Sequence, residues 1–319
     1  MKYNNSKKLL VTALTITLTL SLISANPAFA GVAGQPGNPN DPNFGKCGPM
    51  DVTFAVDNTG SMSGAIMNIQ TNIGTIIGEV ATASAGDYRL GLITFDDMVN
   101  VKRNLGAAPG EVEAFIAGGG IGSTGGVSFP EASDEAKNTA LNNLPAGLRA
   151  DSTGFVGSQI GDPAGFTVPW RANAVKILII FTDALPGGFN DIHDVGFDDV
   201  QFTTLPLTAA TPGILVSDVF IPTPASQPGM IPLMQLDAAN SGGLFLQANA
   251  DGTGTATAIM EIVNECGGMA IGGEILSISI PSLLIGGIAA NAIWIVPIVA
   301  GALGTGFYFT RSHWNKSEE

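Results

Sequence analysis

Basic residues are scarce in this chain of 319 residues, which has 13 lysines and arginines against 27 aspartates and glutamates. Nucleic-acid binding depends on clustered positive charge, so the composition argues against a nucleic-acid partner. Histidine and cysteine are rarer still, with two of each. Zinc sites are built from clusters of these two residue types, so zinc is disfavoured. The acidic balance instead fits a soluble surface that attracts cations.

Signature motifs of common enzyme classes are also missing. The chain has no P-loop, G-x-S-x-G, H-E-x-x-H or C-x-x-C pattern, and no internal repeat. Of the two histidines, His193 stands in an acidic stretch and His313 near the C-terminus. We therefore expect a protein that is not an enzyme, with metal-assisted hydrolysis as the less favoured alternative.

The N-terminus has the pattern of a secretory signal peptide. Residues 1–30 combine a basic start, an apolar run and the small-residue site Ala28-Phe29-Ala30. An uncleaved membrane anchor is the alternative interpretation. The pattern therefore predicts that the chain enters the secretory route.

The C-terminal part has the pattern of one membrane span. Residues 283–309 include no charged residue, and this run of 27 exceeds the roughly 20 residues that a helical span requires. Arg311 and Lys316 follow at once, which favours a C-terminus on the cytoplasmic side. We therefore expect a single-pass type I protein of the cell membrane, with its folded part outside the cytoplasm.

These patterns divide the chain into six parts. The parts are a signal peptide (1–30), a flexible Gly/Pro-rich lead-in (31–48), a folded domain (49–266), a juxtamembrane segment (267–282), a membrane-spanning helix (283–309) and a cytoplasmic tail (310–319). The exterior, residues 31–282, holds eight basic and 25 acidic side chains, a net charge of −17.

The two cysteines, Cys47 and Cys266, flank the folded domain and lie in the predicted exterior. Disulfides persist in that compartment, so an even number of cysteines there favours a bond between them. Two unpaired buried thiols are the alternative. The bond would close a loop of about 220 residues, worth at most about 5 kcal/mol.

Apolar periodicity predicts alternating strands and helices between the cysteines. Strands are expected over 52–56, 88–95, 100–105, 175–181, 213–221 and 244–247, and helices over 66–80, 111–117, 130–144, 230–240 and 256–264. The strand 100–105 is short and charged, which is typical of a sheet edge. The alternation predicts an α/β fold with an open, doubly wound, mostly parallel sheet and helices on both faces.

Two connections, 146–172 and 184–212, are long for a compact domain. They are either functional loops or small insertions.

Oxygen-bearing residues follow two of the predicted strands. The stretch D-N-T-G-S-M-S-G begins at Asp57, directly after one strand, and Asp183 follows the apolar strand 175–181. In open α/β sheets, ligands bind beyond the carboxyl ends of the strands, so both carboxylates should converge there. The loop 122–132 lies between them in sequence and can supply further oxygens.

Such a set of oxygens suits a hard cation. Mg²⁺ prefers six oxygen ligands and keeps several waters, with few carboxylates bound directly. Thr59 and Ser61 can offer hydroxyls from the first loop. The alternative is that Asp57, Thr59 and Ser63 only cap and turn the following helix.

Three motifs in order resemble the von Willebrand factor A (vWA) family. They are D-x-T-G-S-M at 57–62, G-G-x-S-x-P-E-A at 125–132 and W-R-A-N-A-V-K-I-L-I-I-F-T-D-A at 170–184. The resemblance covers residues 49–266 and implies a Rossmann-like sheet with a metal-ion-dependent adhesion site. Cys47 and Cys266 also resemble the disulfide that joins the domain ends in some extracellular members.

The resemblance implies a ligand set for this site. Asp57, Thr59 and Ser61 match the first-loop ligands, and Asp183 matches the third-loop aspartate, which usually binds through water. In the second loop, Glu131 matches the glutamate of some members and Thr124 the threonine of others. Ser128 stands where many relatives have aspartate. For the second loop the resemblance implies Glu131 as the ligand, with Thr124 and Ser128 as open alternatives.

The function implied is adhesion or protein binding that depends on Mg²⁺, or on Mn²⁺ or Ca²⁺. The partner would offer an acidic side chain to the cation. A structural role in a cell-surface layer, with a metal-braced fold and self-association, is the alternative.

Overall fold

The computed structural model describes residues 41–126, 129–161, 165–227 and 229–268. The predicted signal peptide, membrane span and cytoplasmic tail lie outside these residues. Among the described helices, none is long and apolar enough to cross a membrane.

The described residues form one sheet of eight strands in the order β4-β5-β3-β2-β1-β6-β7-β8. The strands are β1 Met50–Asp57, β2 Tyr88–Phe95, β3 Val99–Ala107, β4 Gly147–Ala150, β5 Val156–Gly161, β6 Val175–Thr182, β7 Ile214–Phe220 and β8 Phe245–Gln247. Only the pairs β2–β3 and β4–β5 are antiparallel. The predicted α/β fold with a mostly parallel sheet is confirmed for this part of the chain.

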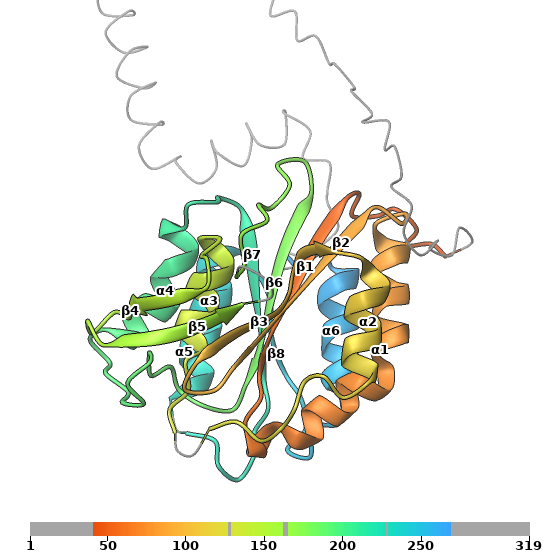
Figure 1. Cartoon of the computed structure of the whole chain (residues 1–319). Helices are drawn as coiled ribbons and strands as arrows, with labels where there is room; N and C mark the ends of the chain where they lie inside the picture. The colour runs from red at the N-terminus through yellow and green to blue at the C-terminus, as the bar shows by residue number, and fades with distance from the viewer. Residues whose placement is uncertain (1–40, 127–128, 162–164, 228, 269–319) are drawn as a thin grey trace, which may run out of the picture.

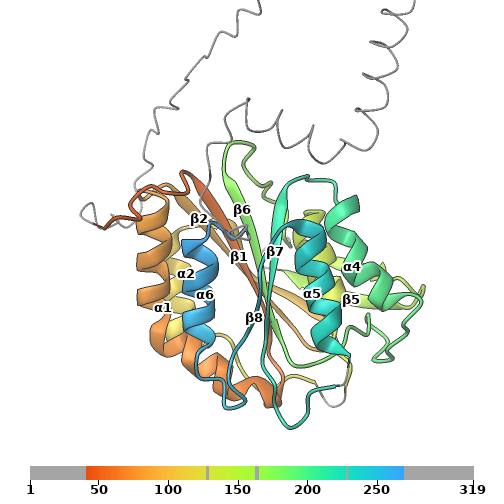
Figure 2. The same cartoon turned by 180° about the vertical axis from the view of Figure 1, so that it is seen from behind.

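Helices cover the sheet in two layers. They are η1 Gly60–Met62, α1 Ser63–Ala83, α2 Pro109–Ala117, α3 Ser133–Leu141, α4 Asp198–Thr208, α5 Met230–Ser241 and α6 Thr255–Asn264. Figures 1 and 2 show α1, α2 and α6 on one face, and α3, α4 and α5 on the other. Each layer has its own buried apolar cluster against the sheet.

The central strand β1 is buried along its whole length. Because successive side chains of a strand point to opposite faces, Phe54 and Val56 join the cluster under α1, whereas Ala55 joins the one under α3. Helix α1 buries a stripe at helical spacing. The stripe consists of Ile66, Ile69, Ile73, Ile76, Ile77 and Val80.

The long connections contain regular structure that the sequence did not reveal. The connection 146–172 forms the hairpin β4–β5, and β5 pairs with the first residues of β3. The prediction that 100–105 is an edge strand is therefore wrong, because β3 lies between β2 and β5. The connection 184–212 contains α4, which has Pro206 in its interior.

Helix α3 is shorter than the predicted 130–144. Pro130 and Glu131 precede it, and a backbone bridge pairs Glu131 with Pro186 instead. Asn143 ends the region with a positive φ of 51°, a conformation that stops a helix.

Cys47 and Cys266 form the predicted disulfide. Nearby, the Gly45 and Cys47 N–H groups donate to the carbonyls of Thr82 and Ala83 at 2.8 and 2.9 Å. The second half of the predicted lead-in therefore packs against the end of α1, and the disulfide joins it to the chain just after α6.

Candidate functional site

Asp57 is the last residue of β1 and is fully buried. Its Oδ1 accepts hydrogen bonds from the Thr59 N–H at 3.0 Å and the Thr59 hydroxyl at 2.6 Å. Its Oδ2 accepts one from the Thr182 hydroxyl at 2.7 Å. The Thr59 and Ser61 hydroxyl oxygens lie 3.1 Å apart. The first loop thus gathers one carboxylate and two hydroxyls in the predicted arrangement.

Of the cap-and-turn interpretation of this loop, the turn is present but a side-chain cap is not. Neither η1 nor α1 has a side-chain hydrogen bond at its N-cap, and the N-cap residues are Thr59 and Met62. Asp57 instead folds back on Thr59 in a local turn of the Asx type.

Asp183 directly follows β6, the neighbour of β1 in the sheet, and is also fully buried. Its Oδ2 accepts a hydrogen bond from the Thr223 hydroxyl. Its Oδ1 has no partner among the described groups. The two aspartates therefore meet at the carboxyl edge of the sheet. This is the switch point of the fold, because the strands that follow β1 are added on one side of it as β2 and on the other side as β6.

Glu131 comes from the second loop and is only 1% exposed. Its N–H donates to the Leu185 carbonyl at 3.1 Å, and its carbonyl accepts from the Gly187 N–H at 2.9 Å. The side-chain Oε2 has no partner among the described groups. The backbone is thus fixed while the carboxyl group remains available.

Gly126 separates the first loop from Glu131. A Cβ at this position would lie 2.7 Å from Thr59 Cγ2 and 3.0 Å from Glu131 Oε1, and its φ is +69°. A side chain there would fill the space between the two loops, so steric crowding explains why the second glycine of G-G-x-S-x-P-E is a glycine. The Gly125 N–H donates to the Asn58 carbonyl at 3.1 Å and joins the loops.

The alternative second-loop ligands have different outcomes. Thr124 is exposed and does not line the cavity at Thr59 and Ser61, so the structure does not bring it to the site. Ser128 lies outside the described residues. Among the described candidates, Glu131 is the one whose carboxyl group lies against the first loop.

The three carboxyl groups carry excess negative charge for a buried site. Burial, followed by the charge of Asp183, raises the pKa of Asp57 to about 7. Burial, followed by the charge of Asp57, raises the pKa of Glu131 to about 10. Burial also raises the pKa of Asp183, although the nearby hydroxyls of Thr223 and Ser61 oppose the shift. Each of these shifts indicates that a positive charge here would be favourable.

A small cavity of about 180 Å³ opens between the loops. It is lined by Thr59, Gly60, Ser61, Gly126, Phe129, Glu131 and Ala225. Within the described ranges, no three histidine, cysteine or acidic side chains close on one point as a metal cluster. The donors here are instead hydroxyls and single carboxylate oxygens, a set that suits a hydrated Mg²⁺. The unpartnered oxygens of Asp183 and Glu131 fit such an ion.

Sequence reasoning missed two supporting residues. Thr182 and Thr223 donate to Asp57 and Asp183, and so orient both carboxylates. Thr223 lies just beyond β7, a third parallel strand. Applying the strand-end rule to the predicted strand 213–221 would have pointed to it.

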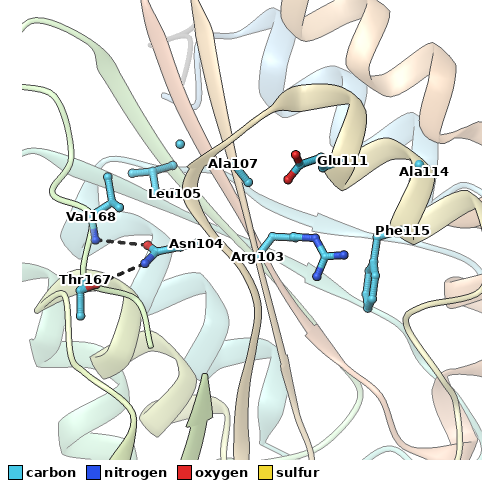
Figure 3. A pocket seen from close by; sticks show the side chains of 10 residues that line it. Arg103, Asn104, Leu105, Ala107, Glu111, Ala114, Phe115, Thr167 and Val168 are labelled. Carbon is cyan, nitrogen blue, oxygen red and sulfur yellow. Dashed lines mark hydrogen bonds between the residues drawn. The ribbon is translucent and has the colours of Figure 1, made fainter. Parts of the chain in front are cut away.

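A larger cavity, of about 860 Å³, is at the other end of the sheet. Figure 3 shows it between α2, the later half of β3 and the segment that carries Thr167 and Val168. Arg103 lies over the Phe115 ring, with its Cζ 4.3 Å from the ring centroid. Asn104 bonds to Thr167 and Val168. Because β3 is antiparallel to β2, this cavity is far from Asp57.

No family model and no curated protein matches the chain. Solved structures similar to it include a conserved hypothetical protein, BatB, from Bacteroides thetaiotaomicron, at 14% identity and a TM-score of 0.43 over 68% of this chain and 98% of that one. The vWF domain of the type V pili tip protein Mfa5 from Porphyromonas gingivalis is 10% identical, with a TM-score of 0.44 over 69% and 95%.

A von Willebrand factor type A protein from Catenulispora acidiphila is 11% identical, with a TM-score of 0.42 over 69% of this chain and 43% of that one. At these identities and TM-scores, the likeness does not show that the chain belongs to any of these families.

Proposed function

We propose that the described domain binds a protein partner through a divalent cation held between its first loop, Asp183 and Glu131. The main support is that Asp183 Oδ1 and Glu131 Oε2 are buried without a partner among the described groups. Glu131 lines the same cavity as Thr59 and Ser61. Unpaired buried oxygens are costly, and a cation would satisfy them.

In this proposal, Asp57, Thr59, Ser61 and Glu131 hold the ion, and Asp183 holds it through water. Mg²⁺ is the favoured ion, with Mn²⁺ or Ca²⁺ as alternatives. When bound, the ion would supply an open coordination position for an acidic side chain of the partner. Backbone hydrogen bonds between Gly125 and Asn58, and between Glu131 and both Leu185 and Gly187, hold the loops in place around the site.

The domain is proposed to act outside the cell, secreted through the signal peptide and held by the span 283–309. It is proposed to be a binding module and not an enzyme. His193 supports this: its Nδ1 lies 2.8 Å from the Pro186 carbonyl oxygen, and it does not line the cavity at Thr59.

The cation step is tested by unfolding the full chain in detergent with Mg²⁺ and with a chelator. At a free Mg²⁺ concentration of about 100 Kd, binding should raise the free energy of unfolding by about 2.7 kcal/mol. In Asp57→Asn this gain should disappear. In chelator the variant should be at least as stable as the wild type, because it removes a repulsion between two buried carboxylates.

Glu261→Gln is the matched control, since Glu261 is an exposed carboxylate on α6. It should keep the full response to Mg²⁺. An Asp57→Asn variant that responds to Mg²⁺ like the wild type would remove the cation from the proposal.

The partner step is tested by comparing proteins retained by the full chain in Mg²⁺ with those retained in chelator. A true partner is captured by the wild type and by Glu261→Gln in Mg²⁺, and is lost both in chelator and with Asp57→Asn. Light scattering of the purified chain under the same conditions tests the alternative. Ordered assemblies that form only in Mg²⁺ would make the partner a second copy, as in a surface layer.

A further inference from the structure

A lysine is completely buried beneath α4, and its partners do not belong to the candidate metal site. Lys137 of α3 is 0% exposed. Its Nζ is ion-paired with Asp237 of α5, which is also 0% exposed. The same Nζ donates to the Phe202 carbonyl at 2.7 Å and lies 3.2 Å from the centroid of the Phe202 ring. The amine and the carboxyl group are thus held in direct contact and out of reach of the solvent.

A second carboxyl group completes this cluster. Asp218 of β7 is 0% exposed, and neither of its oxygens accepts a hydrogen bond from a described group. Burial, followed by the charge of Asp237, raises the pKa of Asp218 well above its usual range, and attraction to Lys137 offsets only part of the shift. The protonated form of Asp218 is thereby favoured, and its carboxyl group lies within hydrogen-bonding reach of Asp237.

As a simple ion pair, the cluster would have a high desolvation cost. One lysine faces two carboxyl groups, and burying charges costs several kcal/mol each unless the surroundings compensate. Burial penalises the charged forms of amines and of carboxyl groups alike, and moving one proton within such a pair converts it into two neutral groups. A neutral amine against a protonated carboxyl group is the reactant pair for amide formation.

We propose that Lys137 and Asp237 condense into an intramolecular amide bond, with Asp218 as the acid that relays the proton. Nζ attacks Cγ of the Asp237 carboxylic acid and forms the C–N bond. Asp218 gives its proton to the departing hydroxyl, the C–O bond breaks, and one water leaves. Asp218 then recovers a proton from Nζ. One amine and one carboxylic acid yield one secondary amide and one water, without an oxidant or a reductant.

The bond would join α3 to α5 beneath α4, between residues that are 100 positions apart. It would replace the buried ion pair of Lys137 and Asp237 by a neutral amide next to one protonated acid. Independently of any cation, it would link α3 covalently to α5 on this face of the sheet.

The test is mass spectrometry of protease digests of the full chain purified from its membrane. The expected result is one linked pair of peptides, containing Lys137 and Asp237, that is lighter than the sum of the two by one water. Lys137→Arg and Asp237→Ala should each abolish the linked pair. Lys102→Arg, a lysine substitution on β3, should retain it.

Asp218→Asn tests the relay, because it keeps the shape of the side chain but cannot donate an acidic proton. It should give the two peptides unlinked in a folded chain, as judged by circular dichroism. A linked pair in Asp218→Asn would overturn the role of Asp218. Two unlinked peptides of full mass in the wild type would overturn the bond itself, and this measurement needs no variant to fold.

Discussion

We expect Asp51→Ala to lose about 3–5 kcal/mol of unfolding free energy, the usual cost of breaking a buried ion pair. Asp51 lies in β1 and is 0% exposed. Its Oδ1 accepts from Arg89 Nε at 2.9 Å and from Arg171 Nε at 2.8 Å, and its Oδ2 accepts from the Arg171 N–H at 2.7 Å. Removing the carboxylate leaves both guanidinium groups without their shared partner.

The lower part of that range is the better expectation. The side chains of Arg89 and Arg171 remain 22% and 21% exposed, so water can solvate them partly in the variant. Chemical denaturation measures the loss. Glu261→Gln serves again as the exposed-carboxylate control and should stay within about 0.5 kcal/mol of the wild type. A loss below about 1 kcal/mol for Asp51→Ala would contradict a structural role for this network.

The same network predicts a pH dependence. Burial alone would raise the pKa of Asp51, but the hydrogen bonds from Arg89 and Arg171 outweigh it and lower the pKa. A carboxyl group with a lowered folded-state pKa stabilises the fold above its unfolded pKa, about 3.9, and loses that contribution as the pH falls through the folded value. In Asp51→Asn this acid-labile part should be absent, while other acid-sensitive groups still respond.

The strands that the sequence predicted best consist mostly of apolar residues. The expected strand 88–95 is β2, and 175–181 extends by one residue as β6. A continuous apolar run is a local signal, because burial on both faces requires it at every position. The hairpin β4–β5 carries no such signal. Its Gln159 is buried because Thr139 and Leu144 bond to its amide, and no local pattern shows this.

In the candidate site, too, some features could be predicted from local sequence and others depend on tertiary contacts. The convergence of Asp57 and Asp183 could be predicted, since it depends only on both following neighbouring parallel strands. The choice between Glu131 and Thr124 could not, because it depends on how the loop folds against Leu185 and Gly187. The sequence pattern left that choice open, and the structure places Glu131 inward and Thr124 outward.

The buried cluster at Lys137 shows the limit most clearly. A lysine within S-D-E-A-K-N-T-A is expected to face solvent on a helix. Its burial depends on Phe202 and on Asp237, which other helices supply. A single sequence does not show which distant carboxylate will meet a given amine.

The second large effect is expected from the disulfide. The double variant Cys47→Ser/Cys266→Ser should lose about 2–5 kcal/mol of unfolding free energy, because the cross-link restricts the unfolded chain over a separation of 219 residues. Guanidinium denaturation should also show a larger m-value for the variant, since its unfolded chain exposes more surface.

The double variant avoids a free thiol, and the oxidised and reduced wild-type chains give an independent comparison of the same bond. Reduction should reproduce the loss seen in the variant. The bond joins the residues before β1 to those after α6, at the end of the sheet away from Asp57, where Cys47 also bonds to the end of α1. Stability should therefore fall, while the proposed Mg²⁺ response per molecule of folded protein should stay the same. A variant that unfolds like the wild type but no longer responds to Mg²⁺ would contradict this separation between the disulfide-linked end of the domain and the proposed metal site.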